Sequence, residues 1–262
     1  MTADGGAKPM KTRIPALLSG LALGASLVLV PAGAAAAASP APAGGPSGNG
    51  QCAPQASAAN SGATVASLRA FADCEIDRRL STLNTLANAV SGSKTLGSDA
   101  GALSGEIAAE KSGLTTLRAS VEAETSAKVL RADLEKIVSD YRVYALVVPQ
   151  VNLTIAADAV LASQPKFSQL GTAVANRIAA ASKAGKNTTA AQADLATMNA
   201  DVASAMALVG PLPAQLVPLT PAQYNAGTAG PILSAARTAI GRARDDLKAA
   251  VAAGKAALAA LK

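Results

Sequence analysis

The chain has 262 residues, of which 50% are hydrophobic but only 2% aromatic, and it carries a formal net charge of +6. It contains no histidine and no tryptophan. The absence of histidine removes the commonest general base and metal ligand. The near-absence of aromatic rings argues against a sugar-stacking surface or an aromatic ligand cage.

Residues 1–38 have the layout of a secretory signal peptide. Three cationic side chains precede an apolar run over residues 14–30, and a string of small residues follows. This order predicts export and cleavage near Ala38, because Pro40 blocks a cut one residue later. Met10 is an alternative start. An uncleaved membrane anchor is the other reading, but the run is shorter than the ~20 residues that a spanning helix usually needs.

The part that would be exported is mildly basic. Removal of residues 1–38 takes away three positive and one negative side chain and leaves a formal charge of +4. This balance favours loose contact with anionic cell-wall polymers or lipid head groups and is too weak for nucleic acid. A solvated surface of mixed charge is the alternative. We expect no later membrane-spanning segment, and hence a secreted protein that is extracellular or associated with the cell wall.

Residues 39–62 are rich in Pro, Gly and Ala without an apolar period, so they predict a flexible leader. The two cysteines are Cys52, in this leader, and Cys74, in the first expected helix. In an oxidising compartment the even count predicts one structural disulfide, which would tether the leader to the helices. Two unpaired thiols, one buried as a small hydrophobic side chain, are the alternative.

Residues 63–209 predict an all-α fold, an elongated antiparallel bundle of helical hairpins with coiled-coil-like packing. Apolar side chains recur at spacings of three and four over residues 76–90 and again over 103–121, where Glu110 intrudes on the stripe. A short polar turn at residues 91–93 separates the two stripes. Equal stripes joined by such a turn are typical of a helical hairpin.

The rest of this range predicts further helices with definite interruptions. A helix from Ser126 should kink or break at Pro149, because proline removes a helix hydrogen bond and disfavours helix before it. A second bend is expected at Pro165. Thr189 and Gln192 have the spacing of a capping box at the start of the next helix.

Residues 210–230 hold four prolines and predict a linker before a C-terminal helix over residues 231–262. Thr220 before Pro221 has the pattern of a short helical turn. The C-terminal helix is basic and its apolar face is mostly alanine. We expect that face to pack on the bundle and the basic side chains to be solvated, since a membrane-surface helix needs bulky apolar residues.

No residue pattern typical of catalysis is found. Asp73, Glu75 and Asp77 alternate as in a calcium loop, but the glycine of that loop is absent and alternate residues diverge within a helix. Glu75 and Arg79 have the spacing of an ordinary helix ion pair. We therefore expect no enzyme activity, no catalytic residue, no cofactor and no metal site.

The stretch 140–149 concentrates two of the three tyrosines, an arginine and a β-branched run at the expected break. Tyr141, Arg142 and Tyr144 are therefore the candidate interaction residues, on a partner-docking or ligand-lining hinge. The alternative is a bulky core plug, with the tyrosine hydroxyls reaching solvent or a backbone carbonyl.

About a third of the chain, residues 76–158, carries a resemblance, in which only the tyrosine-containing stretch is distinctive. The residues concerned are Ile76-Asp77-Arg78-Arg79-Leu80, Leu83-Asn84, Leu130-Arg131-Ala132-Asp133, Asp140-Tyr141-Arg142-Val143-Tyr144-Ala145-Leu146, Pro149-Gln150 and Ala156-Ala157-Asp158. On these residues the segment resembles a group of uncharacterised, secreted, Ala-rich helical proteins of high-GC Gram-positive bacteria. The resemblance implies export and an all-helical fold, and it implies no catalytic residue.

These features together predict a non-enzymatic exported scaffold or interaction protein that acts at the cell envelope or outside the cell. Its expected partner is a cell-wall polymer or an envelope protein, and not nucleic acid. The alternative is an exported binder of a small ligand or client protein, like a chaperone or carrier, with a cleft near Tyr141 and Tyr144.

Overall fold

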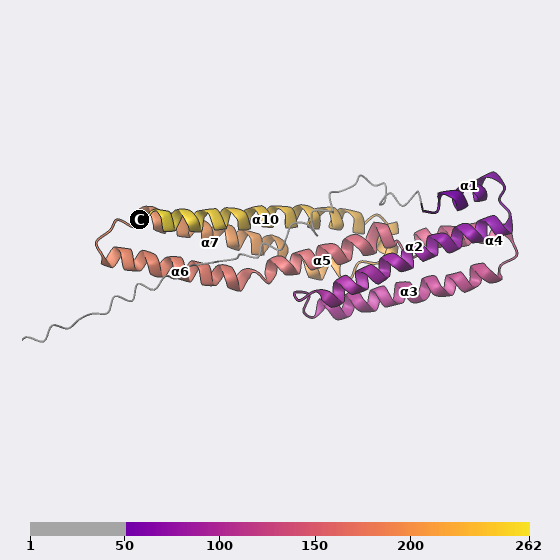
Figure 1. Cartoon of the computed structure of the whole chain (residues 1–262), viewed down its shortest axis with the longest axis horizontal. Coiled ribbons are helices and arrows are strands. Elements are labelled where there is room, and N and C mark those ends of the chain that lie inside the picture. Colours follow the sequence, from indigo (N-terminus) through magenta and orange to yellow (C-terminus); the bar gives the residue numbers. More distant parts are fainter. Residues whose placement is uncertain (1–50) are drawn as a thin grey trace, which may run out of the picture. The chain divides into compact units, whose positions relative to one another are not determined.

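A computed structural model describes residues 51–262 (Figure 1). These residues form helices joined by turns, and none of them lies in a strand, so the all-α prediction is confirmed. The predicted signal peptide, 1–38, and residues 39–50 of the predicted leader lie outside the described residues. That the helices form an elongated antiparallel bundle with coiled-coil-like packing stays a prediction.

Ten α-helices and one π-helical segment, η2, follow one another within residues 51–262. In chain order they are α1 (Ala53–Ser61), α2 (Val65–Gly92), α3 (Asp99–Ala123), α4 (Ala127–Ser139), η2 (Val143–Val147), α5 (Val148–Leu161), α6 (Gln164–Lys183), α7 (Thr189–Val209), α8 (Leu212–Leu216), α9 (Pro221–Asn225) and α10 (Ala229–Ala259). The alanine-rich composition favours this state because alanine has the highest intrinsic helix propensity.

Helices α2 and α3 pack against each other as an antiparallel pair. Arg69, near the start of α2, donates hydrogen bonds to the carbonyl oxygens of Val121 and Glu124 at the end of α3, at 3.2 and 2.6 Å. Further along, Arg118 of α3 forms an ion pair with Asp77 of α2. The two predicted apolar stripes supply the core between them, in which the buried side chains include Ile76, Leu83, Leu86, Val90, Leu103, Ile107, Leu114, Leu117 and Val121.

The predicted leader is not flexible throughout, because residues 53–61 form helix α1. This helix packs on α2, and the Sγ atoms of Cys52 and Cys74 lie 1.99 Å apart, at disulfide distance. Ala59 is the buried residue of α1. The sequence pattern misses α1 because the helix has no apolar stripe of its own and is held by its attachment to α2.

The break expected at Pro149 lies earlier in the chain. Helix α4 ends at Ser139, and Arg142 then adopts a left-handed backbone conformation with φ of 44°. Segment η2 follows, and α5 begins at Val148, which places Pro149 in its first turn. Proline is tolerated there because the first turn of a helix needs no N–H donor. Near Pro165, where a bend is expected, the helix is interrupted between α5 and α6, and the proline lies in the first turn of α6.

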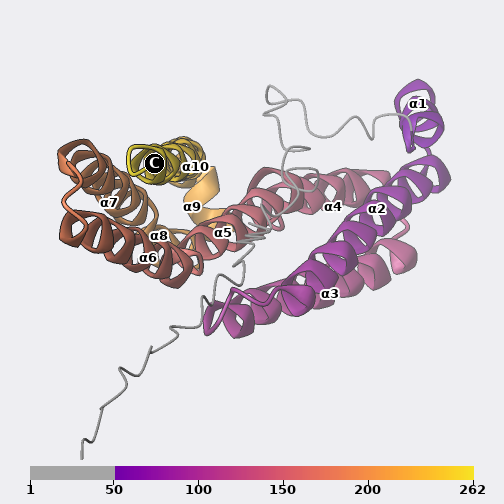
Figure 2. The same cartoon turned by 60° about the vertical axis from the view of Figure 1, so that its left-hand side comes forward.

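Helices α7 and α10 pack along each other, and α6 packs on both (Figure 2). A Cβ atom built on Gly254 of α10 would lie 3.0 Å from Sδ of Met198 in α7, so the glycine permits the close approach of the two helices. Other small side chains buried on these two helices are Ala191, Ala205, Ala229, Ala236, Ala243, Ala250 and Ala257.

The two predicted helix caps have different outcomes. Thr188, and not Thr189, is the N-cap of α7, and its side chain makes no capping hydrogen bond. The Asn187 carboxamide oxygen accepts from the Thr189 N–H instead, at 3.0 Å, so this nearby side chain takes the donor that the predicted box would use. In the proline-rich linker, the expected turn is confirmed as α9, which Thr220 and Gln223 begin with a capping box.

Two helical stretches are long and apolar enough by composition to cross a membrane, where the sequence leads us to expect none. They are Ala127–Lys183 and Thr189–Leu216. The first is interrupted between α4 and η2 and again before α6. The buried core helix of a folded protein passes the same test, so length and hydropathy alone do not decide between the two.

Candidate functional site

The candidate residues lie within the interruption between α4 and α5. Arg142 is the only non-glycine residue with positive φ within 51–262, a conformation that costs free energy for a residue with a Cβ atom. Its side chain makes contacts that hold it there. Arg142 Nε donates to the Asn225 carboxamide oxygen at 2.6 Å, and its guanidinium lies 5.3 Å from the ring centroid of Tyr224. Asn225 also donates to the Ser139 carbonyl at 2.9 Å, so α9 contacts both the end of α4 and the left-handed residue that follows it.

Tyr144 points to α2 and is half-buried against two arginines. The guanidinium carbons of Arg78 and Arg79 lie 4.7 and 5.3 Å from its ring centroid, which is cation–π distance. Thr82 Oγ1 donates to the Tyr144 hydroxyl at 3.3 Å. Both guanidinium groups also pair with the Glu75 carboxylate, so the i,i+4 pair predicted for Glu75 and Arg79 is confirmed and Arg78 joins it.

Tyr141 packs against α3. A Cβ atom built on Gly113 would lie 2.5 Å from Cε1 of the tyrosine ring, so the absence of a side chain at Gly113 makes room for that ring. Burial raises the pKa of the Tyr141 hydroxyl above its ordinary value, and the nearby carboxylates of Asp140 and Glu110 raise it further.

The three candidate residues therefore contact three different partners: Tyr141 contacts α3, Arg142 contacts α9 and Tyr144 contacts α2. They do not converge on one surface. Of the two readings open at the level of sequence, these contacts favour the packed junction over a common docking face. We call residues Asp140–Val147 the junction segment.

A second polar cluster lies between α3, α5 and the turn after α8. Gln150 is fully buried, and its Nε2 donates to the Glu106 carboxylate at 2.9 Å and to the carbonyl oxygens of Val217 and Leu219 at 3.0 and 3.3 Å. One side-chain oxygen of Gln150 and one of Glu110 are buried without a protein partner. Hydrogen bonding to one amide thus connects three segments that are distant in the chain.

The carboxyl groups of this cluster have altered acidity. Burial raises the pKa of Glu106 to about 7. Burial also raises the pKa of Glu110 to about 7, with a further contribution from the charge of Glu106 one helical turn away. The sequence carries one signal for the cluster, since Glu110 interrupts the apolar stripe of its helix. No pattern marks Gln150, because its partners lie far along the chain.

The acidic triplet does not form a metal site. Asp73, Glu75 and Asp77 lie within α2, where Glu75 pairs with arginines and Asp77 with Arg118 of α3. Within residues 51–262, no group of three or more His, Cys, Asp or Glu side chains could hold a metal ion.

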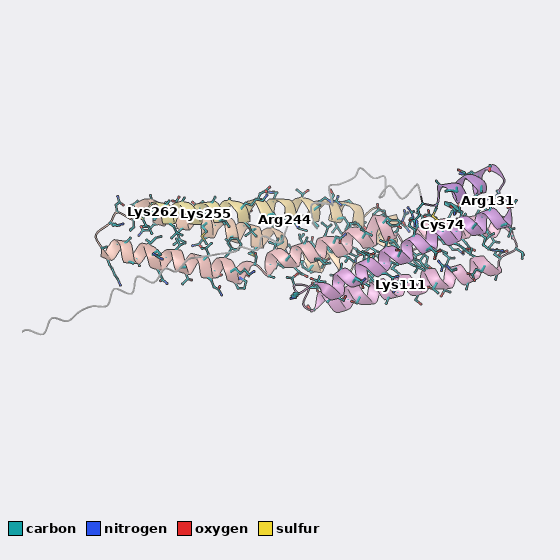
Figure 3. The ribbon with its side chains drawn as sticks, viewed as in Figure 1. Cys74, Lys111, Arg131, Arg244, Lys255 and Lys262 are labelled. Atoms are coloured by element: carbon teal, nitrogen blue, oxygen red, sulfur yellow. A yellow bond between two sulfur atoms is a disulfide. The ribbon has the colours of Figure 1, made fainter. Side chains whose placement is uncertain are left out.

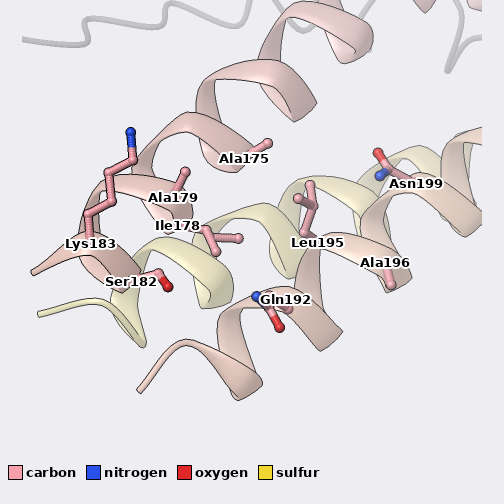
Figure 4. Close-up of a pocket in the computed structure, with 9 residues that line it drawn as sticks. All are labelled: Ala175, Ile178, Ala179, Ser182, Lys183, Gln192, Leu195, Ala196 and Asn199. Atoms are coloured by element: carbon pink, nitrogen blue, oxygen red, sulfur yellow. The ribbon is translucent and has the colours of Figure 1, made fainter. Parts of the chain in front are cut away.

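Two surface hollows are the other candidate sites. An open groove of about 540 Å³ lies between α6 and α7, with Ile178 and Leu195 on facing sides (Figure 4). A more polar hollow of about 580 Å³ lies between α1 and α2, beside the disulfide. Asp73, Arg78 and Thr82 line the second hollow, and burial raises the pKa of Asp73. Tyr141 and Tyr144 line neither of the two.

Comparison with protein-family models, with curated proteins and with solved structures finds no match to this chain.

Proposed function

We propose that the chain is a non-enzymatic, exported helical scaffold or interaction protein that acts at the cell envelope or outside the cell. The observation that supports a scaffold most directly is the use of the junction segment. Its tyrosines and its arginine, the chemically richest residues of an alanine-rich chain, contact α2, α3 and α9. Side chains that hold helices together in this way have a structural role.

Several buried polar groups also have a structural role. Arg79 is bound by Glu75, Gln150 by backbone carbonyls and Glu106, and the buried carboxylate of Asp133 by Lys136 of the same helix at 2.8 Å. Each of these contacts joins or stabilises helices. A protein whose polar interior is used in this way would present its outer helix faces to partners.

Export and the absence of catalysis are tested in one preparation. The full chain is expressed with its native N-terminus in a bacterium, the culture is fractionated, and the N-terminus of the product is determined by mass spectrometry. We expect processing near Ala38 and recovery outside the cytoplasm. The purified product should leave peptidoglycan, ester and peptide substrates unchanged. An unprocessed precursor in the cytoplasm, or hydrolysis of any of these substrates, contradicts the proposal.

The second candidate function is binding of a small ligand or client protein, and the hollow between α1 and α2 is the observation that favours it. Two of its lining residues, Arg78 and Thr82, contact Tyr144. Native mass spectrometry of the purified chain distinguishes the two functions. A stoichiometric small molecule that is lost in a Thr82→Val variant supports the binder, and a ligand-free mass supports the scaffold.

A further inference from the structure

The charge of the described residues is unevenly distributed along the chain. Residues 51–165 contain ten Lys and Arg against twelve Asp and Glu, whereas residues 166–262 contain ten against four. The net charge of the second part, which includes α6, α7 and α10, is therefore +6. All ten of its basic residues are exposed, so this charge lies on the surface. Such a concentration attracts anionic partners over a distance of about a Debye length.

Four of these basic residues form a line along α10. Arg237, Arg244, Lys248 and Lys255 are separated by seven, four and seven residues, which places them within an arc of about 40° around a helix of 3.6 residues per turn. They span roughly 27 Å at 1.5 Å per residue. Arg244 and Lys255 are labelled along α10 in Figure 3. We call these four residues the α10 stripe.

The charges of the α10 stripe are largely available to a partner. Of the ion pairs among residues 51–262, only the one between Lys248 and the exposed Asp245 involves the stripe, at 2.9 Å. Arg237, Arg244 and Lys255 form none with the described residues. By contrast, Arg78, Arg79, Arg118 and Lys136 in the first part are each paired with a carboxylate.

The surroundings of the α10 stripe indicate the kind of partner. The large hydrophobic side chains that are exposed within residues 51–262 are Val129 and Val138, both on α4. Helix α10 thus exposes no bulky apolar residue to insert into a bilayer, and its apolar face packs on α7. It also presents no Trp or Tyr, the anchors typical of protein interfaces. A row of cations along one helix, without apolar anchors, suits a long polyanion.

On these observations, and resting on the proposed location at the cell envelope, we infer that the α10 stripe binds a linear phosphate-bearing polymer. The polymer would lie along the helix, and phosphate groups at intervals along it would contact the four cationic groups. Binding of this kind is driven by release of counterions from the polymer, so its affinity must fall steeply with salt.

The test measures binding of the full chain to long-chain polyphosphate at several salt concentrations. A variant with Arg237→Gln, Arg244→Gln, Lys248→Gln and Lys255→Gln removes the α10 stripe at exposed positions, and circular dichroism checks its helix content. We expect at least about a tenfold loss of affinity at 0.1 M salt. The slope of log affinity against log salt should fall by about 3, as expected for four lost phosphate contacts on a single strand.

The matched control removes the same charge elsewhere. The control variant changes residues 51–165 and carries Lys94→Gln, Lys111→Gln, Lys128→Gln and Arg131→Gln. At 0.1 M salt the Debye length is about 10 Å, so charges far from the α10 stripe contribute little to binding at the stripe. This variant should bind polyphosphate like the wild type. Equal losses in the two variants would overturn the inference, because net charge and not the α10 stripe would then be responsible.

A second arm separates the polymer from a membrane surface. Vesicles of phosphatidylcholine mixed with phosphatidylglycerol present phosphate without a linear chain, and we expect weaker binding to them than to polyphosphate. Binding to the vesicles alone would overturn the inference. Failure of this inference can be told apart from failure of the proposed function. An exported chain without affinity for polyphosphate contradicts only the inference, whereas a chain that binds polyphosphate but stays in the cytoplasm contradicts the proposed function.

Discussion

Tyr144 lies on the guanidinium groups of Arg78 and Arg79 and is the residue through which the junction segment contacts α2. Arg79 is only 5% exposed, so neighbouring groups, and not water, must stabilise its positive charge. Glu75 supplies the opposite charge at 2.5 Å, and the centroid of the tyrosine ring lies 5.3 Å from the guanidinium carbon. The ring thus shields an ion pair within α2 while joining two parts of the chain.

Substitution of Tyr144 should separate these roles. Tyr144→Phe keeps the ring and removes a single hydrogen bond of 3.3 Å, so we expect a loss of at most about 1 kcal/mol in the free energy of unfolding. Tyr144→Ala also removes the ring, and the loss should be about 2–3 kcal/mol. Urea unfolding measures both. Equal losses in the two variants would show that the ring contributes nothing.

Glu106 and Glu110 are the residues most sensitive to pH. Since burial raises the pKa of both carboxyls to about 7, the folded chain binds more protons than the unfolded chain between about pH 4.5 and 7. The free energy of unfolding must therefore decrease as pH rises through this window. With no histidine in the chain, few other groups titrate there, although burial also raises the pKa of Asp158, to about 6.

We predict a higher thermal midpoint at pH 5 than at pH 8. The free energy of unfolding should be larger at pH 5 by on the order of 2 kcal/mol, after allowance for partial exposure of the two groups. The double substitution Glu106→Gln, Glu110→Gln imitates the protonated forms and should leave only the smaller changes due to Asp158 and Asp73. Scanning calorimetry across this pH range measures the effect. The exposed pair Glu122→Gln, Glu135→Gln is the control and should keep the full pH dependence; loss of the dependence there would refute the assignment.

At the scale of elements, α3 shows how one helix combines local preference with tertiary contact. Gly105 and Gly113 both lie within it, where alanine has the higher helix propensity. A Cβ atom on Gly105 would meet nothing within 4 Å, whereas one on Gly113 would lie 2.5 Å from the Tyr141 ring. The two glycines are locally alike and differ in what faces them.

The pair makes a matched test. Gly105→Ala should raise the free energy of unfolding by about 0.5–1 kcal/mol through helix propensity alone. Gly113→Ala gains the same local term but must displace the ring of Tyr141, so we expect a net loss of about 1–2 kcal/mol. Urea unfolding decides. A gain at Gly113 equal to that at Gly105 would mean that the tyrosine ring moves without cost.

At the scale of the molecule, the link between Cys52 and Cys74 attaches α1 to the remaining helices. Helix α1 buries the small side chain of Ala59 and little else that is apolar, so packing alone stabilises it weakly. Closure of a loop with a separation of 22 residues is expected to contribute about 3 kcal/mol in the chain-entropy model.

Reduction of the disulfide should therefore release α1 and leave the other helices folded. Hydrogen exchange followed by mass spectrometry would show loss of protection over residues 53–61 in reductant, with α2 and α3 still protected. A Cys52→Ser, Cys74→Ser variant should match the reduced protein. If α1 kept its protection in either preparation, packing on α2 would be sufficient and the covalent link dispensable.

Local patterns anticipate a large part of this architecture. The turn after Gly92, the interruption near Pro165 and the short helical turn at Thr220 all follow from residues within four positions of one another. Helix hydrogen bonds and caps have this same short range, which is why a linear pattern predicts them. The prediction of a break at Pro149 was wrong for a related reason. A proline in the first turn of a helix is tolerated, so its position in the sequence does not show where the preceding helix ends.

The sequence by itself determined the helical state, most helix limits and the uneven charge, since each depends on composition or on neighbouring residues. Only the tertiary structure decided that Arg142 is left-handed, that Gln150 and Glu106 meet in the interior, and that Tyr141 and Tyr144 contact different helices. These features depend on side chains brought together from positions more than 25 residues apart. Such contacts form when chain entropy is offset by packing of whole helices, and no local pattern records which helices will meet.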